Sequence, residues 1–86
     1  MNILFTSESW EDYIYWEETD KRILKKINEI IKSISIKRDH YNGLGKPEPL
    51  RYELQGCRYR RINEEHRIVY KIDGDVVIII QLRYHY

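Results

Sequence analysis

The amino-acid sequence predicts an α+β fold, in which two N-terminal helices pack on a mostly antiparallel sheet in the order β-α-α-β-β-β-β. Two patterns support this prediction. Apolar residues recur at helical spacing between residues 7 and 34, and they alternate with polar residues from residue 50 onward. A segment rich in turn residues, at about residues 37–49, separates the two patterns. With 86 residues, the chain is expected to form a single domain over residues 1–86.

The N-terminal half is predicted to contain one short strand followed by two helices. The strand is expected at Asn2–Phe5, and Thr6 or Ser7 can cap a helix that ends near Glu18. Thr19 is the predicted cap of the second helix. The first helix carries Trp10, Tyr13 and Ile14 at helical spacing, and the second carries one apolar stripe formed by Ile23, Ile27, Ile30, Ile31 and Ile34.

The C-terminal half predicts a series of strands. Three are expected at residues 50–54, 58–63 and 65–72, and a hairpin turn at residues 73–75 leads into the last strand. That strand starts with the apolar run 76–80 and is expected to extend through the C-terminal residues Arg83, Tyr84, His85 and Tyr86. Such an extension would hold an imidazole and two phenols in fixed positions, either for chemistry or merely to complete a sheet edge.

Composition and charge exclude several classes of protein. The single cysteine, Cys57, rules out an internal disulfide and favours a reducing compartment. The N-terminus lacks the pattern of a secretory signal, and no apolar run approaches the roughly 18 residues of a membrane helix. We therefore expect a soluble, cytoplasmic protein without a membrane partner. The net charge of +1 argues against a protein that coats nucleic acid with a uniformly basic surface.

Positive charge is nevertheless concentrated in one segment. Arginine presents a planar fork that suits phosphate, so this segment is either a local anion site or an exposed strand face kept soluble by its charge. Five of the eight arginines belong to it: Arg51, Arg58, Arg60, Arg61 and Arg67.

The candidate catalytic residues come from separate parts of the chain that strand pairing can bring together. Glu48 lies between two prolines, which fix the local backbone in an extended form. Arg61 and Arg67 lie on the two following strands, and His85 lies near the C-terminus. A carboxylate, two guanidiniums and an imidazole, without acids or histidines at metal-ligand spacing, suit metal-free cleavage of RNA and call for no cofactor.

In such a reaction, a base removes the proton from a ribose 2′-hydroxyl, and the oxygen attacks the adjacent phosphorus. Arginines stabilise the added negative charge, and an acid protonates the departing 5′-oxygen. We expect Glu48 to be the base and His85 to be the acid. DNA lacks the 2′-hydroxyl and would not be cut in this way.

Four blocks of sequence together resemble a known family. They are ESWEDYIYWEETDKRILKKINEIIK in the helices, GKPEPLRYELQG after them, RRINEEHRIVY in the strands and RYHY at the C-terminus. In this order they resemble the Txe/YoeB family of bacterial toxins, in the RelE-like superfamily, and the similarity runs essentially from end to end. The resemblance therefore implies a RelE-like fold.

The resemblance implies the toxin of a type II toxin-antitoxin system. Such a toxin is an endoribonuclease, or mRNA interferase, that cuts mRNA in the ribosomal A site and stops translation. The resemblance makes Glu48 the general base, Arg67 the phosphate-stabilising arginine and His85 the general acid. It also implies substrate or phosphate contacts for Arg51, Arg61, Glu65 and Tyr86.

The resemblance also implies partners. A cognate antitoxin of the YefM or Axe type would hold the toxin inactive, the toxin would act on the 70S ribosome and mRNA, and a homodimer is a family tendency. Tyr15 and Trp16 either contact such a partner or pack between the first helix and the sheet.

Two other functions remain open on the same fold. A ParE-like toxin poisons DNA gyrase without cleaving nucleic acid, and it should lack the acid-base pair that Glu48 and His85 would form. A silent module would bind RNA through the arginine cluster alone. Cys57 is interpreted as a packing residue, because no proposed step needs a thiolate, and His66 is expected to be structural.

Overall fold

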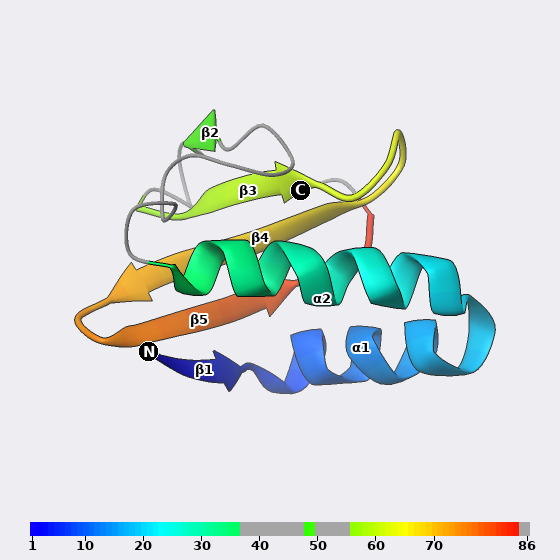
Figure 1. Cartoon of the computed structure of the whole chain (residues 1–86), viewed down its shortest axis with the longest axis horizontal. Coiled ribbons are helices and arrows are strands. Elements are labelled where there is room, and N and C mark those ends of the chain that lie inside the picture. Colours follow the sequence, from blue (N-terminus) through cyan, green and yellow to red (C-terminus); the bar gives the residue numbers. More distant parts are fainter. Residues whose placement is uncertain (37–47, 50–55, 85–86) are drawn as a thin grey trace.

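The order of secondary-structure elements agrees with the predicted β-α-α-β-β-β-β order (Figure 1). The computed structural model describes residues 1–36, 48–49 and 56–84, with residues 48–49 described by their backbone only. The elements are β1 (Asn2–Phe5), α1 (Ser7–Thr19), α2 (Lys21–Ser35), β2 (Glu48–Pro49), β3 (Arg58–Arg61), β4 (Arg67–Asp73) and β5 (Val76–Gln81).

The strands form one mixed sheet in the order β1-β5-β4-β3-β2. β1 pairs with β5 in parallel, and the other neighbours pair antiparallel, so the mostly antiparallel sheet is confirmed. β2 lies at one end of this order, where the missing N–H of Pro49 is tolerated. β2 starts inside the segment predicted to be a loop, because Glu48 pairs with Tyr59. The strand predicted at 50–54 lies outside the described residues.

The predicted cap of α2 is wrong by one residue. Thr19 is the last residue of α1, and its hydroxyl donates to the carbonyl of Tyr15 at 2.6 Å. Asp20 has an extended backbone, and its carboxylate accepts from the N–H groups of Arg22 at 3.0 Å and Ile23 at 3.3 Å. A short carboxylate side chain in an extended conformation satisfies two N–H groups that the first turn of the helix leaves unpaired.

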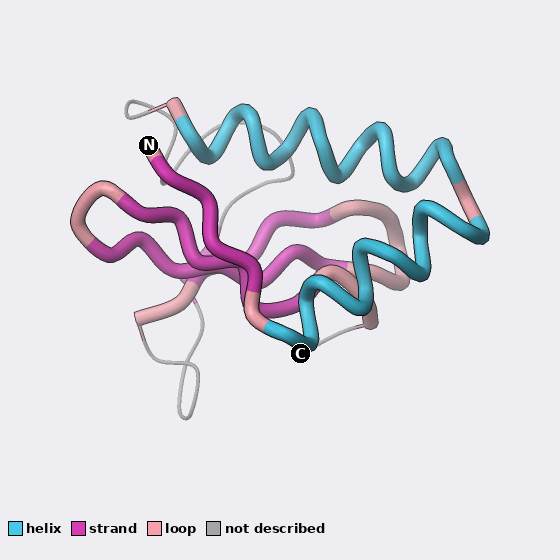
Figure 2. The backbone as a smooth tube through the Cα atoms, turned by 90° about the horizontal axis from the view of Figure 1, so that it is seen from below, coloured by secondary structure: helices cyan, strands magenta, loops and turns pink. Residues whose placement is uncertain are grey.

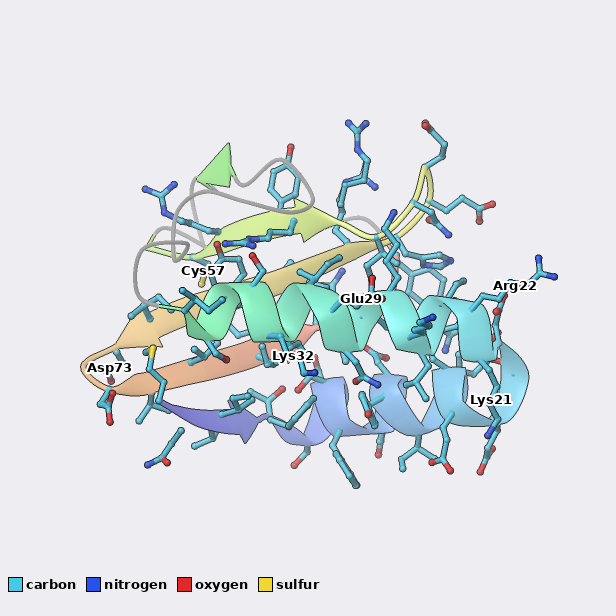
Figure 3. All side chains as sticks on the ribbon, viewed as in Figure 1. Lys21, Arg22, Glu29, Lys32, Cys57 and Asp73 are labelled. Atoms are coloured by element: carbon cyan, nitrogen blue, oxygen red, sulfur yellow. The ribbon has the colours of Figure 1, made fainter. Side chains whose placement is uncertain are left out.

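The two helices differ in how they contact the sheet. α1 begins at the cap Thr6, as predicted, and its Ser9 is fully buried and donates to the carbonyl of Ile79 at 2.7 Å. Trp16 is buried, whereas Trp10, which shares the predicted apolar spacing, is 50% exposed. Charged residues occupy the outward side of α2, and Figure 3 shows the labelled ones: Lys21, Arg22, Glu29 and Lys32.

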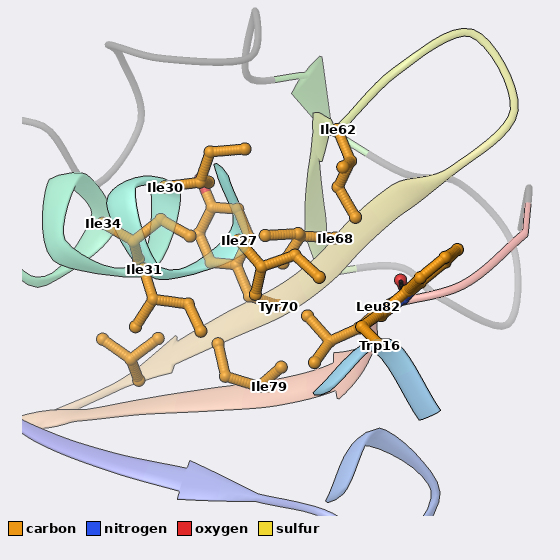
Figure 4. Close-up of a cluster of buried hydrophobic side chains, with 11 residues drawn as sticks. Trp16, Ile27, Ile30, Ile31, Ile34, Ile62, Ile68, Tyr70, Ile79 and Leu82 are labelled. Carbon is orange, nitrogen blue, oxygen red and sulfur yellow. Dashed lines mark hydrogen bonds between the residues drawn. The ribbon is translucent and has the colours of Figure 1, made fainter. Parts of the chain in front are cut away.

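The main core lies between the helices and one face of the sheet. Figure 2 shows α2 as a layer on one side of the strands, and Figure 4 shows the cluster that fills the space between them. Full burial of each aliphatic side chain in this cluster contributes about 1.5–3 kcal/mol to the stability of the fold. The cluster comprises Trp16, Ile27, Ile30, Ile31, Ile34, Ile62, Ile68, Tyr70, Val77, Ile79 and Leu82.

A β-bulge changes the alternation of β5 near its end. Val69 pairs with Gln81, whereas its neighbour Tyr70 pairs with Ile79, so Ile80 is an extra residue in β5. Ile79 and Leu82 therefore both join the main core, although regular alternation would place them on opposite faces. Ile80 packs in a second, smaller cluster with Cys57, Val69 and Tyr59.

The C-terminal segment does not extend β5 as predicted. The strand ends at Gln81, and the chain then bends, with a φ of 63° at Tyr84.

Neither helix in the described part of the chain is long and apolar enough to span a membrane.

Candidate functional site

Two arginines lie side by side on the sheet face that the helices do not cover. Arg61 of β3 is the register partner of Arg67 of β4. Directly opposed residues on antiparallel strands project from the same face, and like charges in this position repel each other. Strand alternation places both on the side opposite Ile68 and Tyr70, which belong to the main core. An anion bound between the two guanidiniums would relieve this repulsion.

The Arg67 guanidinium is held in place by the turn that precedes β4. Its Nη1 donates to the carbonyls of Asn63 at 2.6 Å and His66 at 3.0 Å. The same turn is stabilised by Asn63 Oδ1, which accepts from the N–H groups of Glu65 and His66. The Arg67 Cζ lies 5.9 Å from the ring centroid of Tyr59, and the residue is only 6% exposed. A fixed guanidinium is suited to binding an anion without further loss of side-chain entropy.

Arg61 carries a buried donor that no described residue satisfies. Its Nε is buried and has no hydrogen-bond partner in the described part of the chain. A buried donor without a partner costs about 1–3 kcal/mol, which a bound anion would offset. Arg61 and Arg67 therefore combine two features of an anion site, paired positive charge and unsatisfied donor capacity.

The structure brings part of the predicted catalytic set together. The backbone of Glu48 pairs with Tyr59, whose ring contacts Arg67. The carbonyl of Tyr84 accepts from the N–H of Arg67 at 3.1 Å, so the residue before His85 lies against the start of β4. The Glu48 side chain, Arg51, His85 and Tyr86 lie outside the described residues, and their roles stay predictions.

Glu65 does not lie in β4 as predicted. It belongs to the turn between β3 and β4, and its side chain is 84% exposed. The strand begins two residues later because Asn63 binds the backbone of the turn through its side chain. Glu65 Oε2 lies 4.0 Å from Nε2 of His66. Its contact with substrate stays a prediction.

Arg60 is separated from the surface arginines. It is fully buried on the helix side of the sheet, where Nη1 donates to the Ser33 hydroxyl at 2.7 Å and Nε donates to the Tyr70 hydroxyl at 3.4 Å. Both alternatives given for the arginine-rich segment, a local anion site or an exposed strand face, are therefore wrong for this residue. Its position in β3, one residue from Arg61, was the signal that the two side chains face opposite sides.

Cys57 has the surroundings of a packing residue. It is buried in the smaller cluster, and burial raises the pKa of its thiol above the usual 9.0, while the nearby charge of Lys71 lowers the pKa by a smaller amount. Since the thiolate is the nucleophilic form, burial disfavours nucleophilic chemistry at Cys57. No cluster of three or more His, Cys, Asp or Glu residues that could hold a metal ion occurs in ranges 1–36 and 56–84.

Comparison with known families agrees with the fold. The family model described as "YoeB-like toxin of bacterial type II toxin-antitoxin system" matches residues 5–86. The chain belongs to the YoeB toxin family. It is therefore a toxin of a toxin-antitoxin system, as the sequence blocks implied.

Individual YoeB relatives match over nearly their whole length. Toxin YoeB of Escherichia coli O6:H1 is 55% identical, with both chains covered completely. A solved YoeB/ParE toxin from Agrobacterium tumefaciens is 44% identical, with a TM-score of 0.94 and complete coverage of both chains. Staphylococcus aureus YoeB, 44% identical with a TM-score of 0.91, was solved in a YoeB-YefM complex, and it was also solved as a dimer. The chain covers 98% of that protein and is itself covered completely.

Tyr15 and Trp16, for which partner contact and internal packing were both open, contact other residues within this YoeB-family toxin. Trp16 is 5% exposed and packs in the main core, which confirms the packing alternative. Tyr15 is 37% exposed, and the Arg83 Cζ lies 3.5 Å from its ring centroid.

An apolar groove of about 580 Å³ lies among β1, α1 and α2. It is lined by Ile3, Phe5, Trp10, Tyr13, Asn28, Ile31 and Lys32.

Proposed function

We propose that this YoeB-family toxin is a ribosome-dependent endoribonuclease that cleaves mRNA in the ribosomal A site and thereby inhibits translation. The observation that carries the proposal is the cross-strand pair Arg61 and Arg67. The Arg67 guanidinium is held by two carbonyls, and on the same face Arg61 presents a buried donor that no described residue satisfies. This arrangement fits a phosphate group that gains negative charge during the reaction.

The proposed reaction is an attack by the ribose 2′-oxygen on the adjacent phosphorus. Glu48 takes the proton of the 2′-hydroxyl, the bond between the 2′-oxygen and phosphorus forms, and the bond to the 5′-oxygen breaks. His85 gives a proton to the 5′-oxygen, which leaves as a hydroxyl. Arg67 and Arg61 stabilise the extra charge on the phosphate oxygens. The balanced products are a 2′,3′-cyclic phosphate and a 5′-hydroxyl end, and no further reactant is consumed.

The remaining predicted site residues would bind and orient the RNA. Arg51 would add positive charge near the phosphate, and Tyr86 would orient the nucleotide at the cleaved bond. Glu65 is exposed on the turn beside Arg67, a position from which it could reach a ribosome-bound substrate. These roles follow the resemblance to the family and are part of the proposal.

The proposed partners follow from the same reading. The activity needs the 70S ribosome and mRNA, which places it in the cytoplasm. A YefM-like antitoxin would inhibit it, since the S. aureus relative was solved in a complex with YefM. Homodimerisation is proposed because that relative was also solved as a dimer.

Substitution of the proposed catalytic residues separates cleavage from binding. We expect Arg67→Ala and His85→Ala to sediment with ribosomes but to lose growth arrest and mRNA cleavage, by on the order of 100-fold or more in rate. Arg22→Ala is the control, because it removes one exposed arginine from the start of α2, outside the site. Growth arrest that survives both site substitutions would contradict an enzymatic toxin.

A further inference from the structure

The three residues after β5 follow a path that other elements must hold. Strand β5 ends at Gln81, and the φ of 63° at Tyr84 is a conformation that residues other than glycine rarely adopt. Such a backbone costs free energy and persists only where the surrounding contacts fix it. The contacts of Leu82 and Tyr84 therefore hold residues 82–84 in this conformation.

Helix α1 holds the first residue of this segment. The N–H of Leu82 donates to Oδ2 of Asp12 at 3.0 Å, and the carbonyl of Leu82 accepts from Nε1 of Trp16 at 2.9 Å. The Leu82 side chain is fully buried in the main core. Arg83, the next residue, stacks on Tyr15 of the same helix. Leu82 is thus fixed through both its backbone polar groups and its side chain.

The start of β4 holds Tyr84 from the other side. The N–H of Tyr84 donates to Nδ1 of His66 at 2.7 Å, and the carbonyl of Tyr84 accepts from the N–H of Arg67 at 3.1 Å. A backbone N–H can only donate, so Nδ1 of His66 must carry the lone pair, and in a neutral ring the proton then lies on Nε2. His66 and Arg67 therefore hydrogen-bond to both backbone polar groups of Tyr84.

The His66 ring is itself fixed. It packs edge-on against Trp16, with ring centroids 4.8 Å apart and an interplanar angle of 78°, and its side chain is 12% exposed. Trp16 thus contacts both Leu82, through its indole N–H, and His66, through its ring. The acceptor for Tyr84 has little freedom to move away from its donor.

We propose that His66 is a positioning residue for RNA cleavage, because its Nδ1 holds Tyr84, the residue that precedes the proposed acid His85 in the sequence, beside Arg67 at the start of β4. This inference rests on the proposed function. It gives His66 a role beyond packing, since the geometry needs a hydrogen-bond acceptor at Nδ1 and not only an aromatic ring. Misplacement of a reacting group by about 1 Å can lower a rate 100-fold.

Two substitutions of His66 separate the contribution of its Nδ1 acceptor from the contribution of its ring. His66→Phe keeps an aromatic ring against Trp16 and removes the acceptor. His66→Asn removes the ring but places its Oδ1, which is bonded to Cγ as Nδ1 is, where it can accept from Tyr84. Tyr13→Phe is the matched control, because it removes one hydrogen bond of α1, to Asn28, outside the segment 82–84. Single-turnover cleavage is measured on ribosomes carrying a defined mRNA, and exchange of the Tyr84 amide proton is measured by NMR on the free protein.

We expect His66→Phe to lower the maximal cleavage rate on the order of 10- to 100-fold at an unchanged half-saturating concentration, and to lose protection of the Tyr84 amide. His66→Asn and Tyr13→Phe should stay close to the unsubstituted protein in both measurements. Normal cleavage by a folded His66→Phe protein, or an equal loss in His66→Asn, overturns the positioning role. An unsubstituted protein that protects the Tyr84 amide but leaves ribosome-bound mRNA intact overturns the proposed function instead.

Discussion

Arg60 and Arg61 are neighbours in the sequence but lie on opposite faces of the sheet. Arg60 is fully buried beneath α2 and bonded to Ser33, whereas Arg61 lies opposite Arg67 on the uncovered face. A charged group is buried at low cost only when its donors have partners, so the Ser33 hydroxyl stabilises the fold through Arg60. At the residue scale, one arginine therefore belongs to the core and the other to the proposed phosphate site.

Removal of the Ser33 hydroxyl should measure this contribution. We expect Ser33→Ala to lower the free energy of unfolding by about 1–3 kcal/mol, because a buried donor of Arg60 loses an acceptor. The measurement is urea denaturation followed by circular dichroism. Ser35→Ala is the control on the same helix, since that hydroxyl donates to the carbonyl of Ile31 within the helix, and a change within about 0.5 kcal/mol is expected. Equal effects of the two substitutions would contradict the role given to Ser33.

The junction between α1 and α2 shows how one residue separates two elements. The chain passes from Thr19, the last residue of α1, to Lys21, the first residue of α2, through Asp20 alone. Asp20 N–H still donates to the carbonyl of Trp16, and its carboxylate caps the next helix. One extended residue thus ends α1 and starts α2, which lets α2 fold back over the sheet beside α1 (Figure 1).

Two substitutions at this junction test which residue is the cap. Asp20→Ala should lower the free energy of unfolding by about 0.5–2 kcal/mol, because two N–H groups of α2 lose their acceptor. Thr19→Ala should change it by no more than about 0.5 kcal/mol, because the Thr19 hydroxyl is exposed and bonds within α1. Thermal and urea denaturation of both variants provide the comparison. A larger loss for Thr19→Ala would restore the cap predicted from the sequence.

At the scale of the whole molecule, the sequence predicts the order and type of the elements well, because the helical periodicity of α2, the alternation in β4 and the apolar run in β5 determine them. The end of β5 could not be predicted, since the bulge at Ile80 depends on the register with β4. The contacts that hold residues 82–84 join Asp12, which binds Leu82, and His66, which binds Tyr84, and these residues are distant in sequence from the C-terminal segment. Neither feature leaves a local signal, although spacing along β3 does distinguish Arg60 from Arg61.

The small number of reacting groups in the proposed site leads us to expect that the cleavage rate depends on the ribosome. The proposed chemistry uses one base, one acid and two arginines, so alignment of the RNA must supply much of the rate, and orientation can contribute several kcal/mol. We therefore expect the purified protein to cut naked RNA at least about 100-fold more slowly than ribosome-bound mRNA of the same sequence. Gel analysis of end-labelled RNA, with and without ribosomes, measures this ratio.

The central claim is cleavage of ribosome-bound mRNA, and primer extension tests it most directly. The purified protein is added to a translating extract, and new mRNA 5′ ends are mapped beside a His85→Ala protein and a sample that contains mRNA without ribosomes. The proposal predicts new ends at ribosome-occupied codons, absent with His85→Ala and absent without ribosomes. Arrested translation with intact mRNA would contradict it and would identify a toxin that acts by binding alone.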